Sequence, residues 1–375
     1  MRVGFDVSKL FGPRDGVARY SASLLEALAE LSEERGGRPG LVLYALDAEV
    51  DSRGWRRLLE GLPGNVRRGP GRWPRRRELD LFHIPTFADP ACFDGPVVFT
   101  IHDLTFLTHP KFHVPANRNQ CLLATLRAVA QGATIIAVSE ATAGEVRKWF
   151  ALPDDRLRVV HEAASAAFAA FDGADLEAAR ERLAERFGLD GPFVLSVGTL
   201  EPRKNIARLI EAYGGLGPDL RSRVPLALVG GGGWKRDVVF AGDWPDFVRR
   251  LGAVSEEDLI ALYNVASVVA YPSLVEGFGL PVVEAMACGT PVLTSDRSSL
   301  AEVAGDAALC VDPFDVAAIR RGLDALLREP SRRDRYRQAG LDRAATFSWR
   351  RAAEEVVGIY DEIVRGTGPR TAGAP

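Results

Sequence analysis

Short apolar runs alternate with amphipathic stretches along nearly the whole chain. An apolar run at 2–8 precedes a polar loop and a helical pattern over about 17–32, and FVLSVG (193–198) precedes another loop and a helical pattern from about Ile206. Further strand-length runs lie at 41–46, 81–85, 96–102, 134–139, 157–161, 226–230, 267–273, 291–295 and 307–312. Strands that alternate with helices predict parallel sheets. The pattern therefore predicts an α/β protein with two doubly wound, Rossmann-like domains.

The domain boundary is expected in the alanine-rich stretch 163–175. We assign residues 1–168 to an N-terminal domain and residues 169–349 to a C-terminal domain. A chain of 375 residues is too long for one ordinary core, which agrees with two domains. The amphipathic stretch over about 350–367 predicts a final helix, and residues 368–375 are expected to be disordered.

Composition narrows the classes of function. The net charge is −3 and the sequence pI about 6.1, so the overall charge gives no indication of a nucleic-acid partner. No apolar run approaches the roughly 18 residues that a membrane span needs, and the start MRVGFDVSKL lacks the regions of a signal peptide. The four cysteines are scattered without metal-ligand spacing, which favours reduced thiols and a cytoplasmic location.

One stretch departs from this average, the arginine cluster RRGPGRWPRRRE (67–78). It reads either as a solvated loop or as a surface that meets an anionic membrane or a phosphate-bearing acceptor. The second interpretation predicts a peripheral membrane contact through Arg67–Arg77, at the inner face of the membrane.

The most informative stretch is YPSLVEGFGLPVVEAMACGTPVLTSD (271–296), in which Glu276 and Glu284 form an E-x7-E pair. Gly277, Phe278 and Gly279 lead into Leu280-Pro281, where a helix is expected to start with proline in its first position. Glycines before a helix N-terminus let backbone N–H groups approach a ligand, and the positive end of the helix dipole attracts an anion. The stretch therefore predicts a site for a phosphate group.

The two acids of this pair have distinct expected roles. Glu284 is expected in the first helical turn, pointing aside from the phosphate, where it could accept hydrogen bonds from a ribose diol. Glu276, in the preceding loop, could accept from sugar hydroxyls. The alternative is that Glu276 is an ordinary loop acid and Glu284 a favourable charge near a helix N-terminus.

The loop GTLEPRKN (198–205) follows a predicted strand and carries the adjacent cations Arg203 and Lys204. Ligands of open parallel sheets bind at the carboxyl ends of strands, so these cations could stabilise a departing nucleoside diphosphate. The alternative is surface charge beside a helix, but acids are more usual there. Weaker candidates for donor binding are Gly230 and Gly231, in the glycine run after the strand at 226–230.

The loop LGAVSEEDL (251–259) adds Val254 as a candidate donor contact, directly before a helix that Ser255 is expected to cap.

The N-terminal half offers fewer candidates. His102 and Asp103 end the strand PVVFTI, which places His102 at a carboxyl-end position, although a single histidine is more often structural. Gly16, in the first loop, could let the backbone approach a diphosphate. Ser139 is expected to cap a helix, with ligand contact as a second role. The chain holds no D-x-D motif, so we expect no metal and no other cofactor.

Several long blocks resemble the GT4 family of retaining glycosyltransferases, and specifically its bacterial mannosyltransferase-like branch. The likeness covers nearly the whole chain and is strongest in the blocks GVARYSASLLEAL (16–28), HDLTFLTHPKFH (102–113), AVSEATAGEV (137–146), VGTLEPRKNIARLIEAY (197–213), LYNVASVVAYPSLVEGFGLPVVEAMACGTPV (262–292) and SSLAEVAGDAAL (298–309). The resemblance implies a GT-B fold, with an acceptor domain, a donor domain, a cleft between them and a C-terminal helix that crosses back. It also implies a nucleotide-sugar donor and a glycan or lipid-linked acceptor.

The resemblance assigns roles to individual residues. Arg203 and Lys204 match the diphosphate-binding pair, Glu284 the ribose-binding acid and Glu276 the acid that contacts the donor sugar. His102 matches a histidine near the transferred sugar. The loop Gly277–Gly279 matches backbone near the sugar and phosphate, and Gly16 matches the first-loop glycine, although FGPRDG holds fewer glycines than many members.

The family is thought to retain the anomeric configuration by a front-face step, in which the departing phosphate takes the acceptor proton. A double displacement with Glu276 as nucleophile is the alternative chemistry. The branch points to GDP-mannose as donor, with UDP-sugars open. A nucleotide-sugar epimerase and a non-catalytic partner subunit are alternatives of other classes, and the intact motif residues argue against both.

Overall fold

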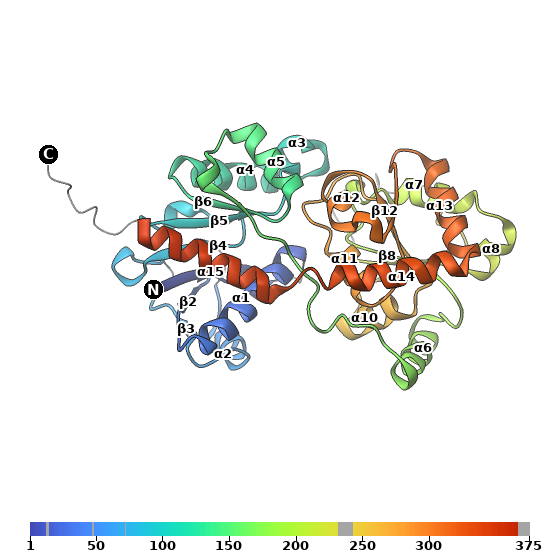
Figure 1. The fold of residues 1–375 in the computed structure, drawn as a ribbon, viewed down its shortest axis with the longest axis horizontal. Helices are drawn as coiled ribbons and strands as arrows, with labels where there is room; N and C mark the ends of the chain where they lie inside the picture. Colours follow the sequence, from blue (N-terminus) through green and yellow to red (C-terminus); the bar gives the residue numbers. More distant parts are fainter. Residues whose placement is uncertain (13–14, 47–48, 72, 232–242, 367–375) are drawn as a thin grey trace. The chain divides into compact units, whose positions relative to one another are not determined.

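The computed structural model describes residues 1–12, 15–46, 49–71, 73–231 and 243–366. It divides into two compact units (Figure 1). Unit 1 consists of Met1–Thr108, Pro115–Glu162 and the end of the chain from Ser348, and unit 2 consists of His109–Val114 and Ala163–Phe347. The sequence placed the division after residue 168 and the return segment at about 350. The predicted disordered tail, 368–375, lies outside the described residues.

Unit 1 contains a parallel sheet of seven strands in the order β3-β2-β1-β4-β5-β6-β7. The strands are β1 (Arg2–Asp6), β2 (Gly40–Tyr44), β3 (Arg67–Arg68), β4 (Leu81–Ile84), β5 (Val97–Ile101), β6 (Thr134–Ala137) and β7 (Leu157–Val159). The helices of this unit are α1 (Gly16–Glu34), α2 (Ser52–Glu60), α3 (Thr105–Thr108), α4 (Pro115–Ala130), α5 (Glu140–Phe150) and α15 (Trp349–Gly366). Strands β1, β4, β5 and β6 are buried almost throughout, because their sequences are apolar on both faces.

Unit 2 contains a parallel sheet of six strands in the order β10-β9-β8-β11-β12-β13. The strands are β8 (Val194–Val197), β9 (Leu226–Val229), β10 (Val248–Gly252), β11 (Val268–Tyr271), β12 (Val292–Ser295) and β13 (Leu309–Val311). The helices are α6 (Gly173–Phe187), α7 (Ile206–Gly214), α8 (Pro218–Arg223), α10 (Glu256–Val265), α11 (Leu280–Ala287), α12 (Ser298–Ala304), α13 (Val316–Arg328) and α14 (Pro330–Ala344).

The two parallel sheets predicted from the apolar runs are confirmed, but two edge strands were missed. Strand β3 has only two residues, both exposed arginines, and lies inside the cluster that the sequence suggested was a loop. Strand β10 has the sequence VRRLG, with Arg249 and Arg250 exposed. Edge strands tolerate charged side chains, so neither shows the apolar run by which the central strands were recognised.

Each sheet has one topological switch point, where the order in which successive strands are added to the sheet reverses. In unit 1 this position lies between β1 and β4, and in unit 2 between β8 and β11. Ligands of such sheets bind beside the carboxyl ends of the two strands at this point. In unit 2 the loops concerned are 198–205, after β8, and 272–279, after β11. These are the loops in which the sequence placed the cations and the first glutamate of the E-x7-E pair.

The last helix of the chain, α15, completes unit 1. It packs along α1, as Figure 1 shows for the red and dark-blue helices. Its Tyr360 hydroxyl lies 2.5 Å from Nδ1 of the buried His83, and Arg350 forms an ion pair of 2.6 Å with Glu34 of α1. Within the described ranges, no helix combines the length and the apolar composition that a membrane crossing requires.

Candidate functional site

The loop after β8 presents its two cations from a short 3₁₀ turn, Pro202–Lys204. Asn205, which follows, has a left-handed backbone conformation (φ 60°), and its side-chain amide donates to the carbonyls of Pro272 (3.0 Å) and Pro313 (2.6 Å). The Leu274 N–H donates to the Arg203 carbonyl at 2.8 Å. These bonds fix the loop after β8 against the loop after β11, so the cations have a defined place at the carboxyl edge of the sheet.

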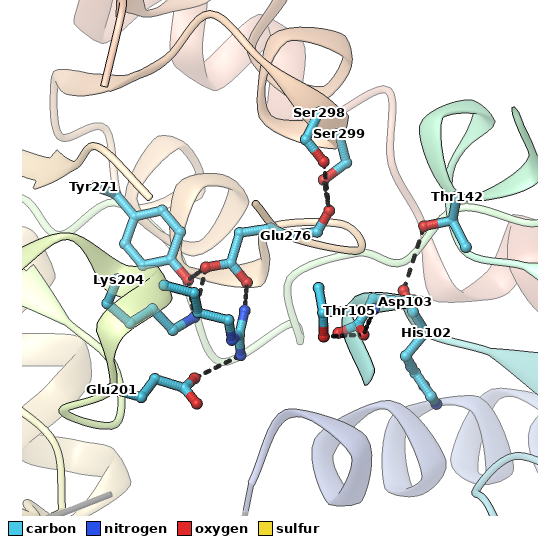
Figure 2. A network of polar contacts seen from close by, with 11 residues as sticks. His102, Asp103, Thr105, Thr142, Glu201, Lys204, Tyr271, Glu276, Ser298 and Ser299 are labelled. Carbon is cyan, nitrogen blue, oxygen red and sulfur yellow. Dashed lines mark hydrogen bonds and ion pairs between the residues drawn. The ribbon is translucent and has the colours of Figure 1, made fainter. Parts of the chain in front are cut away.

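Glu276 binds both cations. Its Oε1 lies 2.7 Å from Nζ of Lys204 and accepts a hydrogen bond of 2.9 Å from the hydroxyl of Tyr271 at the end of β11. Its Oε2 accepts from Nη1 of Arg203, whose Nη2 lies 2.7 Å from Oε1 of Glu201. Figure 2 shows the Lys204 and Tyr271 side chains meeting at the Glu276 carboxylate. The sequence identified the cations and Glu276 separately; the structure joins them in one network.

Burial strengthens the electrostatic interactions between the charged groups of this network. Burial alone would raise the pKa of the Glu276 carboxyl, but the charges of Arg203 and Lys204 outweigh it and hold the pKa at about 2. Burial and the neighbouring Arg203 lower the pKa of Lys204, against the opposing effect of Glu276. Burial, with the Glu276 charge, raises the pKa of Tyr271 well above its usual value, so this side chain remains a neutral phenol. Glu276 is therefore an ionised carboxylate surrounded by donors.

The backbone around Glu276 is also held firmly. The hydroxyls of Ser298 and Ser299 donate to the Glu276 carbonyl at 2.8 and 2.9 Å (Figure 2). Gly279 caps the following helix, α11, with φ 116°, a conformation that favours glycine. The helix begins at Leu280, so Pro281 occupies its second position and not its first. The phosphate site expected at this N-terminus thus has the glycine-led backbone that the sequence indicated.

Glu284 lies deeper than expected. The first turn of α11 holds no acid, because the helix begins at Leu280 and Glu284 falls in its second turn. The carboxylate is buried (2% exposed), and its Oε2 accepts a hydrogen bond of 2.9 Å from the Tyr263 hydroxyl of α10. The expectation of a first-turn acid is therefore corrected. The ribose contact stays a prediction.

The remaining donor-side candidates have different surroundings. Phe278 is buried against Phe347, with ring centroids 5.5 Å apart, and Gly277 is buried beside it. Val254 is partly buried in the loop before α10, where Ser255 caps the helix as predicted. Gly231 is exposed, and Gly232 and Gly233 of the glycine run lie outside the described residues.

Gly230 has a structural reason to be glycine. Its φ is 145°, and a Cβ at this position would lie 2.0 Å from the carbonyl oxygen of Gly198. The N–H of Gly198 in turn donates to the Val229 carbonyl at 2.8 Å. Close backbone packing between the ends of β8 and β9 therefore accounts for Gly230, and it sets the start of the loop that carries Arg203 and Lys204.

The Gly230→Ala variant is expected to lose at least about 2 kcal/mol of unfolding free energy, because a strained φ and a backbone clash each cost about 1–3 kcal/mol. Thermal and urea unfolding measure the loss. Gly191→Ala is the matched control, because a Cβ there would meet nothing within 4 Å. Equal stability of the two variants would contradict this account of Gly230.

In unit 1, His102 follows β5, and both of its ring nitrogens have partners. Nε2 lies 2.9 Å from the Pro85 carbonyl, and Nδ1 lies 3.4 Å from Oε1 of Glu162. The ring of Tyr20 meets the imidazole edge-on at 4.7 Å. Burial would lower the pKa of His102, but the hydrogen bond and the charge of Glu162 outweigh it and raise the pKa. The predicted contact with the sugar remains a prediction.

The other candidates of unit 1 lie at starts of helices. Asp103 Oδ1 accepts from the N–H (2.9 Å) and the hydroxyl (2.6 Å) of Thr105 at the start of α3 (Figure 2). Ser139 caps α5 as predicted and accepts from the Thr142 N–H at 3.0 Å. Gly16 is the exposed first residue of α1. No ligand role of these three residues is tested by these contacts.

The Glu162→Gln variant is expected to be less stable than the wild type by about 2 kcal/mol at pH 6, since a hydrogen bond to a charged group contributes about 1.5–3 kcal/mol. A histidine whose pKa is raised on folding adds stability that is fully present below its unfolded pKa, about 6.5, and is lost as the pH rises through the folded pKa. The difference between the two proteins should therefore shrink towards pH 9. Urea unfolding at both pH values measures it, and a difference that grows with pH would contradict the pairing.

Sequence reasoning missed Tyr271, Glu201 and Glu162. Tyr271 ends β11 and Glu162 follows β7 closely, so both lie near the carboxyl edge of a sheet, which was the available signal. Glu201 stands two positions before Arg203, and its acid was overlooked beside the cations. Among the residues that the structure describes, no group of three or more His, Cys, Asp or Glu side chains is placed to hold a metal ion.

Comparison with known proteins gives matches along most of the chain. Residues 14–165 match Glycosyltransferase Family 4, and residues 179–343 match the family of glycosyl transferases group 1. The chain is 33% identical to O-antigen chain mannosyltransferase B of Escherichia coli, over 96% of this chain and 99% of that protein. It is 31% identical to serotype-specific mannosyltransferase WbdA of Escherichia coli, over 74% of this chain but only 34% of that longer protein.

Among solved structures, the fold is similar to that of Anabaena HepE in complex with UDP and glucose. The TM-score is 0.72 at 17% identity, over 96% of this chain and 100% of that one.

Proposed function

Because the chain belongs to glycosyltransferase family 4 and is a nucleotide-sugar-dependent, retaining hexosyltransferase, we propose that it transfers mannose from GDP-mannose to a growing surface polysaccharide. The observation that carries the choice of sugar is the 33% identity to an O-antigen chain mannosyltransferase over nearly the full length of both proteins. Because this likeness spans unit 1 as well as unit 2, it bears on the acceptor as well as on the donor.

The proposed donor site lies in unit 2. Arg203, Lys204 and the N-terminus of α11 would bind the diphosphate and stabilise the charge that develops as the sugar C1–O bond breaks. Glu276 would accept hydrogen bonds from the sugar and Glu284 from the ribose. No metal is needed in this scheme, since the two cations and the helix N-terminus supply the positive charge.

Two chemistries can retain the configuration. In the first, the departing phosphate oxygen takes the acceptor proton while the new C1–O bond forms on the same face. In the second, Glu276 attacks C1 and is later displaced. The first is favoured, because it depends on strong stabilisation of the leaving diphosphate, which Arg203, Lys204 and the N-terminus of α11 would supply.

The test supplies the purified protein with GDP-mannose and a mannose-terminated oligosaccharide, with and without EDTA. Mass spectrometry detects the extended product, and NMR determines its anomeric configuration. Transfer that resists EDTA and yields the retained anomer supports the proposal. Transfer from a UDP-sugar instead would replace the donor, an alternative supported by the likeness in fold to HepE, which was solved with UDP and glucose. Nucleotide binding without any transfer would favour a non-catalytic partner subunit.

A lipid-linked acceptor and a peripheral membrane contact extend the proposal. Arg67 and Arg68 are exposed on the edge strand β3, and Trp73 is 51% exposed in the segment that follows. An anionic surface would attract such a segment. Co-sedimentation with phosphatidylglycerol vesicles, and not with phosphatidylcholine vesicles, would support the contact; replacing Arg67 and Arg68 with glutamine should weaken it.

A further inference from the structure

The cations assigned to the diphosphate are already neutralised within unit 2. Arg203 divides its guanidinium between Glu276 and Glu201, and Lys204 binds Glu276. Two positive and two negative side chains therefore meet, and their formal charges cancel. In the described part of the chain, the Lys204 ammonium has two polar partners, Glu276 and the Tyr271 hydroxyl.

A diphosphate cannot simply be added to this arrangement. It would bring about two negative charges next to the Glu276 carboxylate, which is only 7% exposed. Like charges in a poorly solvated site repel strongly. The cations also have few free directions, because Arg203 already uses both of its terminal nitrogens on carboxylates. Binding of the donor therefore requires that Glu276 break at least one of its ion pairs with Arg203 and Lys204.

We propose that Glu276 competes with the donor diphosphate for Arg203 and Lys204. When the complete donor binds, the Glu276 carboxylate gives up these cations and accepts hydrogen bonds from the hydroxyls of the donor sugar instead. The inference rests on the proposed function of this site and deepens it. The exchange links the two ends of the donor: the phosphates take the cations, and the sugar supplies the hydrogen bonds that the carboxylate loses. A nucleoside diphosphate without its sugar leaves Glu276 uncompensated and should bind less well for that reason.

Tyr271 is the positioning residue of this exchange. Its hydroxyl donates to Oε1 of Glu276, the same oxygen that binds Lys204. Because its pKa is raised well above the ordinary value, the phenol keeps its proton and remains a donor. When Lys204 turns to the phosphate, Tyr271 still stabilises the released carboxylate, which would otherwise be a buried charge without a side-chain donor.

The test is calorimetric titration with inorganic pyrophosphate, which carries the charges of the donor but neither base nor sugar. Glu276→Gln removes the competing charge and should bind pyrophosphate at least tenfold more tightly than the wild type, about 1.4 kcal/mol. The affinity of Glu276→Gln for GDP should rise by a similar factor, so GDP should also become a stronger product inhibitor of its residual transfer activity. Glu257→Gln is the matched control, because it removes one exposed acid of unit 2 that pairs with Arg182; its pyrophosphate affinity should not change.

Tyr271→Phe should act in the opposite direction and weaken pyrophosphate binding several-fold. In the Glu276→Gln background the same change should have no effect, because no carboxylate remains to be stabilised. A merely structural role of Tyr271 would give the same loss in both backgrounds. Unchanged or weaker pyrophosphate binding by folded Glu276→Gln overturns the inference. If that variant does not fold, unchanged or tighter binding by Tyr271→Phe overturns it.

Pyrophosphate keeps this outcome separate from the proposed donor. A protein that uses a UDP-sugar would fail the GDP-mannose assay and still show the pyrophosphate effects. A protein that transfers mannose but shows no gain in Glu276→Gln would keep the proposed function and lose the exchange.

Discussion

Lys204→Met is expected to lower kcat by about 10²–10³-fold, the usual effect of removing one group that stabilises developing charge. Methionine keeps the unbranched stem, which passes close to Gly198: a Cβ there would lie 3.3 Å from Cε of Lys204. The fold should therefore survive while the ammonium is lost. Because Lys204 would act on the leaving phosphate in the transition state, the loss should fall mainly on kcat.

Steady-state kinetics with the donor identified by the transfer assay measures this effect, and thermal unfolding checks the fold. Lys148→Met is the control, since Lys148 is an exposed residue of α5 in unit 1. Near-normal turnover by Lys204→Met would remove Lys204 from the leaving-group site. A loss confined to KM would assign it to binding of the ground state alone.

Glu284→Gln is expected to lower kcat/KM by about 10–150-fold, the equivalent of about 1.5–3 kcal/mol for a hydrogen bond to a charged group. Oε2 of Glu284 accepts from the Tyr263 hydroxyl, and we assign the ribose contact to Oε1. Glutamine can still accept from Tyr263, but its NH₂ group then faces the ribose with a donor where an acceptor is needed. The donor affinity should fall with kcat/KM.

Direct titration with GDP compares the wild type, Glu284→Gln and Tyr263→Phe. Tyr263→Phe keeps the carboxylate and removes one hydrogen bond to it, so its effect on GDP affinity should be the smaller of the two. The reverse order would show that Glu284 supports the fold of α10 and α11 and does not contact the ribose.

The fold was predictable because its central strands are buried on both faces. Strands such as β5 and β8 are mostly apolar and buried throughout, whereas β3 and β10 carry exposed arginines at sheet edges and were missed. The helix at Leu280 was also predictable, because Gly279 permits the left-handed conformation before the helix and Pro281 fixes a helical φ in its first turn. Whether Glu284 falls in the first or second turn depends on a single position of the helix start, which the sequence did not determine.

The contacts within the site were harder to predict. Arg203 and Glu276 are 73 residues apart in the chain, and their pairing depends on two loops that meet only because β8 and β11 are neighbours in the sheet. The sequence assigned both residues to the donor but treated their charges as independent. Similarly, His102 pairs with Glu162, which follows β7 and reaches the histidine through the position of β7 beside β6.

The position of α15 bears on how the chain is made and how it can be recombined. This helix is synthesised after all of unit 2, yet it packs on α1, which precedes unit 2 in the chain. Unit 1 therefore cannot complete its core until translation has passed through all of unit 2, so unit 2 is the part able to fold first on the ribosome. For the same reason, a chimera that exchanges donor halves between relatives should keep residues 348–366 with unit 1 and replace only residues 163–347.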